Sequence, residues 1–292
     1  MWGRKVATRR WFIPYCRLCY NFGAALLRGP NIPRSYTMSP RPLILVTNDD
    51  GIRAPGLEML ATALASVGEV EVYAPESQQS AVGHSVSLHK PLRVNTLKPG
   101  WHMVDGTPTD CVMLAVRQLL GRKPDLVVSG VNAGANLGDD VIYSGTVAGA
   151  VEGMLLGVPS IAVSDVSYHP VHQQTAAEVA VVVARYVLAH GLPADTTLNV
   201  NVPDCPYAEL KGLAITRMGR RNYHDEIVCR TDPRGGAYYW IGGDEPAHIK
   251  EEGTDFEAIE LGKVSITPLQ RDVTHHAVMH HFYEPAITLQ TT

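Results

Sequence analysis

The chain has 292 residues, a formal net charge of −4, 45% hydrophobic residues and 18% charged residues. This composition excludes a largely disordered or fibrous chain, and no apolar run approaches the roughly 18 residues that a membrane-spanning helix needs. Residues 1–37 contain seven basic and no acidic residues, so the remainder carries a net charge of −11, which argues against a nucleic-acid polymer as the partner.

Residues 1–37 form a basic N-terminal extension that lacks both the continuous apolar core and the small-residue cleavage site of a secretory signal. An organelle transit peptide and an extension upstream of a start at Met38 are both compatible with this composition, and we favour the second. We expect residues 1–37 to be disordered and residues 38–292 to form a single α/β domain.

Short apolar runs alternate with amphipathic stretches from residue 42 onward, which predicts strands alternating with helices. Strands are expected at 42–48, 69–75, 125–131, 159–165 and 196–203. Helices are expected at 55–68, 107–121, 144–157 and 173–191, and a hairpin-like excursion at 85–106. Helices between consecutive strands predict a Rossmann-like, mostly parallel sheet with helices on both faces, spanning residues 41–203.

The pattern changes after Asp204, where short β-prone pieces (211–219, 238–243 and 262–269) are separated by glycine, proline and charged residues. This sequence pattern predicts a β-rich decoration of the core at 204–292, which includes a C-terminal β-hairpin arm. Five scattered cysteines do not form a disulfide framework, and Cys16 and Cys19 make one CxxC with no second pair. We therefore expect a reducing, cytoplasmic location.

Asp49 and Asp50 follow the first predicted strand directly and precede Gly51 in the stretch LVTNDDGI. Ligands in open α/β sheets bind outside the carboxyl ends of the strands, and glycine allows the turn that would direct both carboxylates to one ion. A solvated Asp-Asp-Gly turn is the alternative explanation when the pair is considered alone.

Further oxygen donors follow the neighbouring strands. Ser80 lies in the polar loop after the second strand, and Asn132 and Asn136 follow the third strand among closely spaced glycines. Two aspartates, a hydroxyl and an amide oxygen together would suit a hard divalent cation rather than zinc.

The segment YSGTVAGAVEG starts a helix with Ser144, Gly145 and Thr146. Unpaired backbone N–H groups at a helix N-terminus bind phosphate well, although an ordinary cap is also compatible with these residues. A hard cation and an anion-binding helix end at one sheet edge point to phosphate-ester chemistry.

The blocks LVTNDDGI, GHSVSLHKPLRV, GTPTDCV and SGVNAGANLGDDVIYSGTVAGA together resemble the SurE family of metal-dependent nucleotidases, over about residues 42–272. The resemblance implies hydrolysis of nucleoside 5′- and 3′-monophosphates, a homodimer or homotetramer held by the hairpin arm, and one Mg²⁺ or Mn²⁺ per subunit. It implies Asp49, Asp50, Ser80 and Asn132 as metal ligands, and phosphate contacts from Asn136, Ser144, Gly145 and Thr146.

The implied mechanism is metal-assisted attack of water on a phosphomonoester, in which we expect Asp49, Asn136 and Ser144 to be the catalytic residues. Two alternatives remain open: a non-catalytic nucleotide- or phosphate-binding module, and a zinc-dependent deacetylase. The second is disfavoured because Thr47 and Asn48 stand where such an enzyme needs a histidine. His84 could approach the site or pack its own loop, and we expect the HHAVMHH segment to be a solvated helix.

Overall fold

The computed structural model describes residues 41–222, 226–242 and 247–282, all of which belong to one unit, Pro40–Thr292. The predicted extension 1–37 lies outside the described residues. The main elements follow in chain order. They are β1 (Leu43–Thr47), α1 (Pro55–Leu64), β2 (Glu69–Pro75), β3 (Val94–Lys98), β4 (Trp101–Val104), α2 (Pro108–Leu114), β5 (Leu126–Ala133), α3 (Gly145–Leu155), β6 (Ser160–Asp165), α4 (Gln173–His190), β7 (Thr196–Val202), β8 (Leu213–Ile215), β9 (Arg221–Asn222), β10 (Glu226–Thr231), β11 (Ala237–Gly242), β12 (Ala247–His248), α5 (Asp255–Glu260) and β13 (Val264–Gln270).

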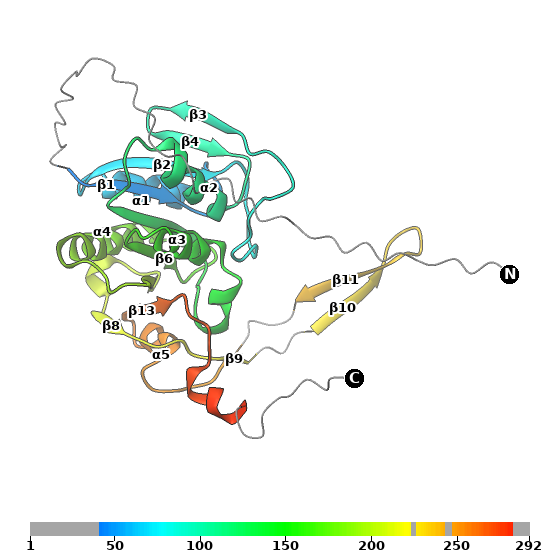
Figure 1. The fold of residues 1–292 in the computed structure, drawn as a ribbon. Coiled ribbons are helices and arrows are strands. Elements are labelled where there is room, and N and C mark those ends of the chain that lie inside the picture. Colours follow the sequence, from blue (N-terminus) through cyan, green and yellow to red (C-terminus); the bar gives the residue numbers. More distant parts are fainter. Residues whose placement is uncertain (1–40, 223–225, 243–246, 283–292) are drawn as a thin grey trace, which may run out of the picture. The chain divides into compact units, whose positions relative to one another are not determined.

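Nine strands form the central sheet in the order β3-β4-β2-β1-β5-β6-β7-β13-β8 (Figure 1). The pairs from β4 through β7 are parallel, whereas β3 pairs with β4, and β13 with β7, in the antiparallel sense. Strands β10 and β11 form a separate antiparallel hairpin. The predicted mostly parallel α/β sheet and its C-terminal hairpin are confirmed.

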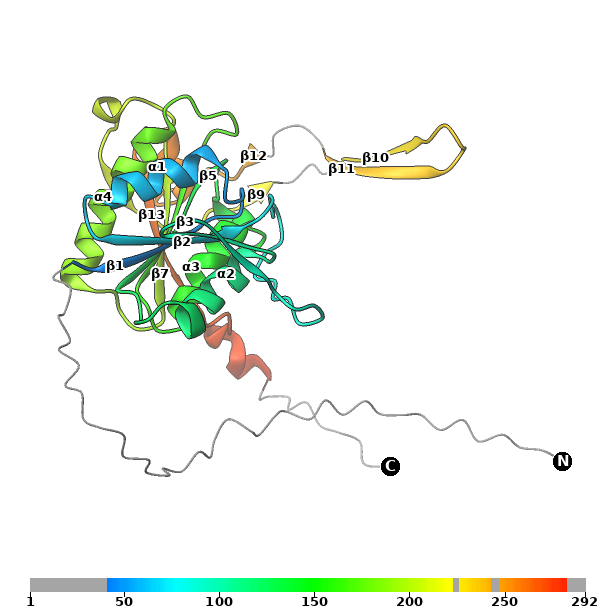
Figure 2. The same cartoon turned by 90° about the horizontal axis from the view of Figure 1, so that it is seen from above.

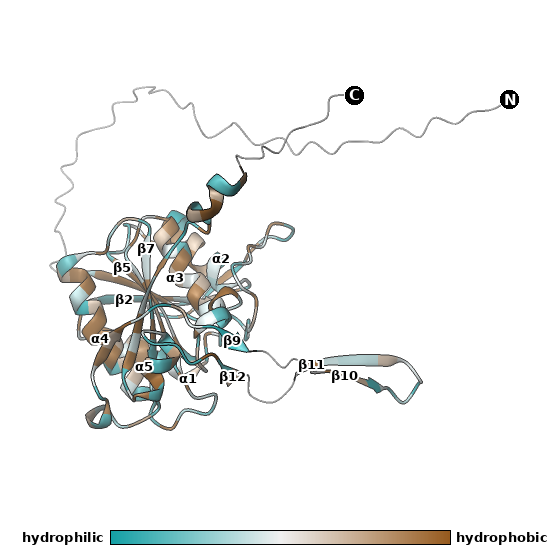
Figure 3. Ribbon diagram, turned by 90° about the horizontal axis from the view of Figure 1, so that it is seen from below, coloured by the Kyte–Doolittle hydropathy of each residue, from teal (hydrophilic) through white to brown (hydrophobic). Residues whose placement is uncertain are grey.

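Helices cover both faces of the sheet because successive residues of a buried strand point in opposite directions. Ile44 and Val46 pack with Leu57 of α1 in one core cluster, to which α4 also contributes. Leu45, between them, packs with Cys111 and Val112 of α2 in another cluster. Figure 2 shows α1 and α4 on one side of the strands and α2 and α3 on the other. In Figure 3, hydrophobic colour follows the central strands, while α4 is hydrophobic along one part of its surface only.

The sheet extends further along the chain than the sequence indicated, because β13 and β8 join it beyond β7. They come from the segment predicted to be decoration outside the core. Val264 and Ile266 are buried at alternate positions of β13 and belong to the same core cluster as Ile44. Strand β13 runs antiparallel to β7 and therefore breaks the β–α alternation on which the prediction relied.

Helix α2 begins as predicted at Thr107, which caps it. The Thr107 hydroxyl accepts a hydrogen bond from the Asp110 N–H at 3.2 Å, and the Asp110 carboxylate accepts one from the Thr107 N–H at 2.9 Å. The same hydroxyl donates to the Ser85 carbonyl at 2.8 Å, which ties the loop after β2 to the helix. Among the described residues, no helix is both long enough and apolar enough to cross a membrane.

We expect Thr107→Ala to lower the free energy of unfolding by about 1–2 kcal/mol, since it removes a cap and one loop contact. Thr107→Ser, which keeps the hydroxyl, should lose less than half of that. Urea denaturation followed by circular dichroism measures both variants. Equal losses in the two variants would mean that the methyl group, and not the cap, is what matters.

Candidate metal and phosphate site

The predicted donors lie where the chain changes direction in the sheet. From β1 the chain continues to β2 on one side, whereas β5, the other neighbour of β1, is followed by β6 further away. Such a switch point opens a crevice at the carboxyl ends of the two strands. Asp49 and Asp50 follow β1, and Asn132 lies at the corresponding end of β5.

Asp49 is a buried carboxylate with 5% of its surface exposed. Burial, with a smaller contribution from the adjacent charge of Asp50, raises its pKa to about 6, although hydrogen bonds from the side chain and backbone of Thr146 act in the opposite direction. The Thr146 hydroxyl donates to Asp49 Oδ1. The folded chain therefore holds a carboxylate whose negative charge is poorly solvated, although it is hydrogen-bonded.

Asp50 is half-buried, and burial raises its pKa as well. Its Oδ2 accepts a long hydrogen bond of 3.4 Å from the Ala133 N–H on β5. Within the described parts of the chain, neither Asp49 nor Asp50 forms an ion pair with a basic side chain. Two neighbouring carboxylates with no basic partner favour a bound cation at this position.

Asn132 and Ser80 supply the neutral oxygens. The Asn132 amide nitrogen donates to the Gly134 carbonyl at 2.7 Å, which leaves the amide oxygen to act as an acceptor. Ser80 is exposed, and its hydroxyl oxygen accepts from Gln78 Nε2 at 2.8 Å. The Gln79 N–H donates to the Asp49 carbonyl at 2.7 Å, which brings the Ser80 loop against Asp49.

This donor set fits a hard divalent cation, because all four candidate ligands would bind through oxygen. Across residues 41–222, 226–242 and 247–282, no group of three or more His, Cys, Asp or Glu side chains is arranged to hold a metal. A site at this edge therefore depends on the hydroxyl and amide oxygens beside the aspartate pair.

Helix α3 starts directly against Asp49. Ser144 is its N-cap, with the hydroxyl oxygen accepting from the Val147 N–H at 3.0 Å. A Cβ atom added to Gly145 would lie 2.8 Å from the Asp49 Cβ and 2.9 Å from its Oδ2, so a larger residue would collide with the carboxylate. The glycine thus lets the positive end of the helix dipole approach a buried negative charge.

Two predicted phosphate contacts have other partners in the structure. Thr146 is fully buried and its hydroxyl is engaged with Asp49. Asn136 is 6% exposed, and its amide nitrogen donates to Ser164 Oγ at 2.7 Å. Thr146 therefore orients Asp49, and Asn136 fixes the loop that follows β5.

Two asparagines that we did not predict, Asn199 and Asn201, hold this loop in place. The Asn136 N–H donates to Asn201 Oδ1 at 2.8 Å, and its carbonyl accepts from Asn199 at 2.8 Å and from Asn201 at 3.0 Å. Both asparagines come from β7 and are fully buried. Polar residues at alternate positions of TTLNVNVP are the signal that could have identified them.

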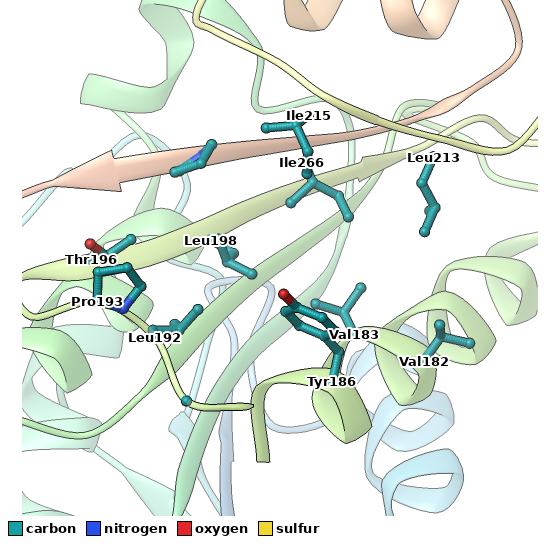
Figure 4. Close-up of a pocket in the computed structure, with 12 residues that line it drawn as sticks. Val182, Val183, Tyr186, Leu192, Pro193, Thr196, Leu198, Leu213, Ile215 and Ile266 are labelled. Carbon is teal, nitrogen blue, oxygen red and sulfur yellow. The ribbon is translucent and has the colours of Figure 1, made fainter. Parts of the chain in front are cut away.

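Two other features are not ligands in this donor set. The exposed His84 ring pairs with the buried Glu152 of α3, with 2.9 Å between Nε2 and Oε2. A cavity of about 480 Å³ lies between α4, β7, β8 and β13, lined by residues such as Tyr186, Leu198 and Ile215 (Figure 4). No charged side chain lines it, so it offers nothing to hold a metal or a phosphate.

The fold and the site together define an α/β protein with an oxygen-donor site at its topological switch point. The profile of the family described as "Survival protein SurE" matches residues 44–225. The chain belongs to the SurE family.

Its relatives include proteins named 5′-nucleotidase SurE. That of Pelobacter propionicus is 55% identical over 237 residues, covering 81% of this chain and 96% of the relative. That of Geobacter sulfurreducens is 55% identical over 235 residues, covering 80% and 90%. The crystal structure of the SurE protein from Aquifex aeolicus is similar with a TM-score of 0.76 and 45% identity, covering 84% of this chain and all of that one.

We expect Gly145→Ala to lower the free energy of unfolding by about 1–3 kcal/mol, because the added methyl group must displace Asp49 or the start of α3. At an unobstructed first position of a helix, alanine would instead stabilise the fold. Gly121→Ala is the matched control, because a Cβ there meets nothing within 4 Å. Chemical denaturation compares the two, and a stabilising Gly145→Ala would contradict the close approach.

Proposed function

We propose that this chain is a divalent-metal-dependent phosphomonoesterase that hydrolyses nucleoside 5′- and 3′-monophosphates to nucleosides and phosphate. Its membership of the SurE family, and the name 5′-nucleotidase SurE of relatives 50–55% identical to it, support this activity. The structural observation that carries the proposal is the buried Asp49 carboxylate against the N-terminus of α3.

We propose Asp49, Asp50, Ser80 and Asn132 as the ligands of one Mg²⁺ or Mn²⁺ ion. The burial of Asp49, the absence of a basic partner among the described residues and the available Asn132 oxygen support this set. When bound, the cation supplies a Lewis acid that polarises the phosphoryl group and orients the attacking water.

The chain's own groups would bind the phosphoryl oxygens at the start of α3. The Ser144 oxygen accepts the Val147 N–H, which leaves the hydroxyl hydrogen to donate to a phosphate oxygen. The Gly145 N–H belongs to the unpaired first turn of the helix and can donate in the same direction. Thr146 contributes indirectly by fixing the carboxylate of Asp49.

Asp49 is also our candidate for the base that assists the attacking water. Its buried carboxylate, held by the Thr146 hydroxyl, would accept the proton of that water. Asn136, which we predicted as catalytic, keeps the Asn132–Gly134 loop in position through its contact with Ser164. Its direct contact with phosphate stays a prediction.

We further propose a homodimer or homotetramer in which the β10–β11 hairpin makes contacts between subunits. Ile227, Tyr239, Trp240 and Ile241 are exposed on this hairpin, and apolar side chains gathered on a surface favour association. A cytoplasmic location is supported by the thiols of Cys111, Cys205 and Cys229, which are all free.

Mn²⁺ affinity should fall about tenfold between pH 7.5 and pH 5. The raised pKa of Asp49 means that its carboxylate binds a proton as the pH falls through about 6, and metal and proton compete for the same oxygens. Isothermal titration calorimetry in buffers of different ionisation enthalpy measures the affinity and the released proton. An affinity independent of pH in this range would remove Asp49 from the ligand set.

Phosphate release from a panel of nucleoside monophosphates tests the activity. We expect turnover with Mg²⁺ or Mn²⁺, loss of turnover on chelation with EDTA, and at least a hundredfold lower kcat for Asp49→Asn. Asp195→Asn is the control, since this exposed carboxylate pairs with Arg271 at the surface, at 3.3 Å. Turnover that survives chelation would contradict the metal dependence, and tight binding without turnover would favour the non-catalytic module.

A further inference from the structure

A cavity of about 670 Å³ borders the loop that follows β5. Its walls come from the loop after β5, the loop after β6, and the segment that contains β9 and α5. The lining residues are Ala135, Leu137, Val166, Ser167, Tyr168, His169, Arg221, Phe256 and Ile259. Small-molecule pockets of proteins have volumes of roughly 300–1,000 Å³ and mostly apolar walls.

The cavity shares one loop with the proposed ligands. Asn132 donates to the Gly134 carbonyl, and the next residue, Ala135, already lines the cavity. The Gly134 N–H donates to the Asp165 carbonyl at 3.0 Å, immediately before the loop that carries Tyr168. The end of β5 and the residues after it therefore connect the proposed cation ligand Asn132 to the wall of the cavity.

Tyr168 lies against this loop and remains accessible. A Cβ atom on Gly134 would be 2.8 Å from Tyr168 Cε1 and 2.9 Å from Cδ1, so the ring contacts the glycine backbone directly. The side chain is nevertheless 65% exposed. Gly134 also has a φ of +122°, which disfavours any other residue there. The structure thus keeps an aromatic ring next to the ligand loop while much of its surface faces solvent.

A second aromatic ring of the cavity, that of Phe256, cannot serve a ligand in the same way. Phe256 is 4% exposed. The His248 ring stacks on it with centroids 4.6 Å apart, and the Arg221 guanidinium lies 5.0 Å from its centroid. Phe256 is therefore part of the floor of the cavity, and Tyr168 is the phenyl-type ring with an accessible surface.

The guanidinium at the cavity edge is already engaged. The Arg221 guanidinium donates to Asp140 at 2.8 Å, and the Arg221 N–H donates to Asp139 at 2.9 Å. A paired guanidinium favours a neutral, planar group in this cavity over a second phosphate.

We propose that this cavity binds the nucleobase of the substrate and that Tyr168 is the platform on which the base stacks. The inference rests on the proposed nucleotidase function, and it adds a base-binding subsite to it. Stacking on an aromatic ring accepts every base, since each has a π-face. The subsite therefore separates nucleotides from phosphate esters that carry no base, and discriminates little among the bases.

The test compares AMP with ribose 5-phosphate, which has the same phosphate ester and no base. In Tyr168→Ala we expect the KM for AMP to rise about tenfold, while kcat for AMP and both constants for ribose 5-phosphate stay within about twofold. Tyr168→Phe keeps the ring and should behave like the unchanged chain. Tyr207→Ala is the control, since this exposed tyrosine lies outside the cavity.

Adenosine binding provides a readout that does not need turnover. Calorimetric titration in EDTA should show weaker adenosine binding in Tyr168→Ala and unchanged binding in Tyr168→Phe. An equal loss for AMP and ribose 5-phosphate would assign Tyr168 to holding the Gly134 loop and overturn the inference, as would no loss for either substrate. Absence of hydrolysis of every phosphomonoester by the unchanged chain would instead contradict the proposed function, so the two failures are distinguishable.

Discussion

The charge of Asp49, placed where water hardly reaches it, is the constraint around which the site is built. A buried carboxylate with a pKa of about 6 is unfavourable at neutral pH unless nearby groups compensate for its charge. Helix α3 provides part of that compensation through the Thr146 hydroxyl and the positive end of its dipole. Gly145 is the residue whose small size permits the approach. The part of the Asp49 charge that α3 does not compensate favours a bound cation. The same side chain therefore affects both the stability of the fold and the binding of the ligand.

The sequence predicts the arrangement of this edge well because it follows from periodicity. A buried run such as Leu43–Thr47 must be a strand, and the parallel order brings the ends of β1 and β5 together whatever the loops do. The sequence pattern alone therefore predicts Asp49, Asp50 and Asn132 at one edge of the sheet. The cap of α3 is equally local, since Ser144 and the glycine after it form a recognisable helix start.

The parts that sequence patterns missed depend on contacts between distant segments. Strand β13 pairs with β7 across more than sixty residues of sequence, and no local pattern distinguishes it from the hairpin of β10 and β11. The hydroxyl of Thr146, a residue that we predicted to contact phosphate, donates to Asp49, nearly a hundred positions earlier. Whether a hydroxyl serves a substrate or a neighbouring carboxylate is decided by packing, which the linear pattern does not contain.

The loop between β5 and α3 connects the two ends of the binding region. At its start, Asn132 and Gly134 stand between the aspartate pair and Tyr168. In its middle, Asp139 and Asp140 hold Arg221, which lies over the ring of Phe256. At its end, Ser144 caps the helix that approaches Asp49. One continuous segment therefore contributes to the cation site, the cavity wall and the helix start. The glycines of this segment, which have no side chain, let its backbone approach the three neighbouring groups closely.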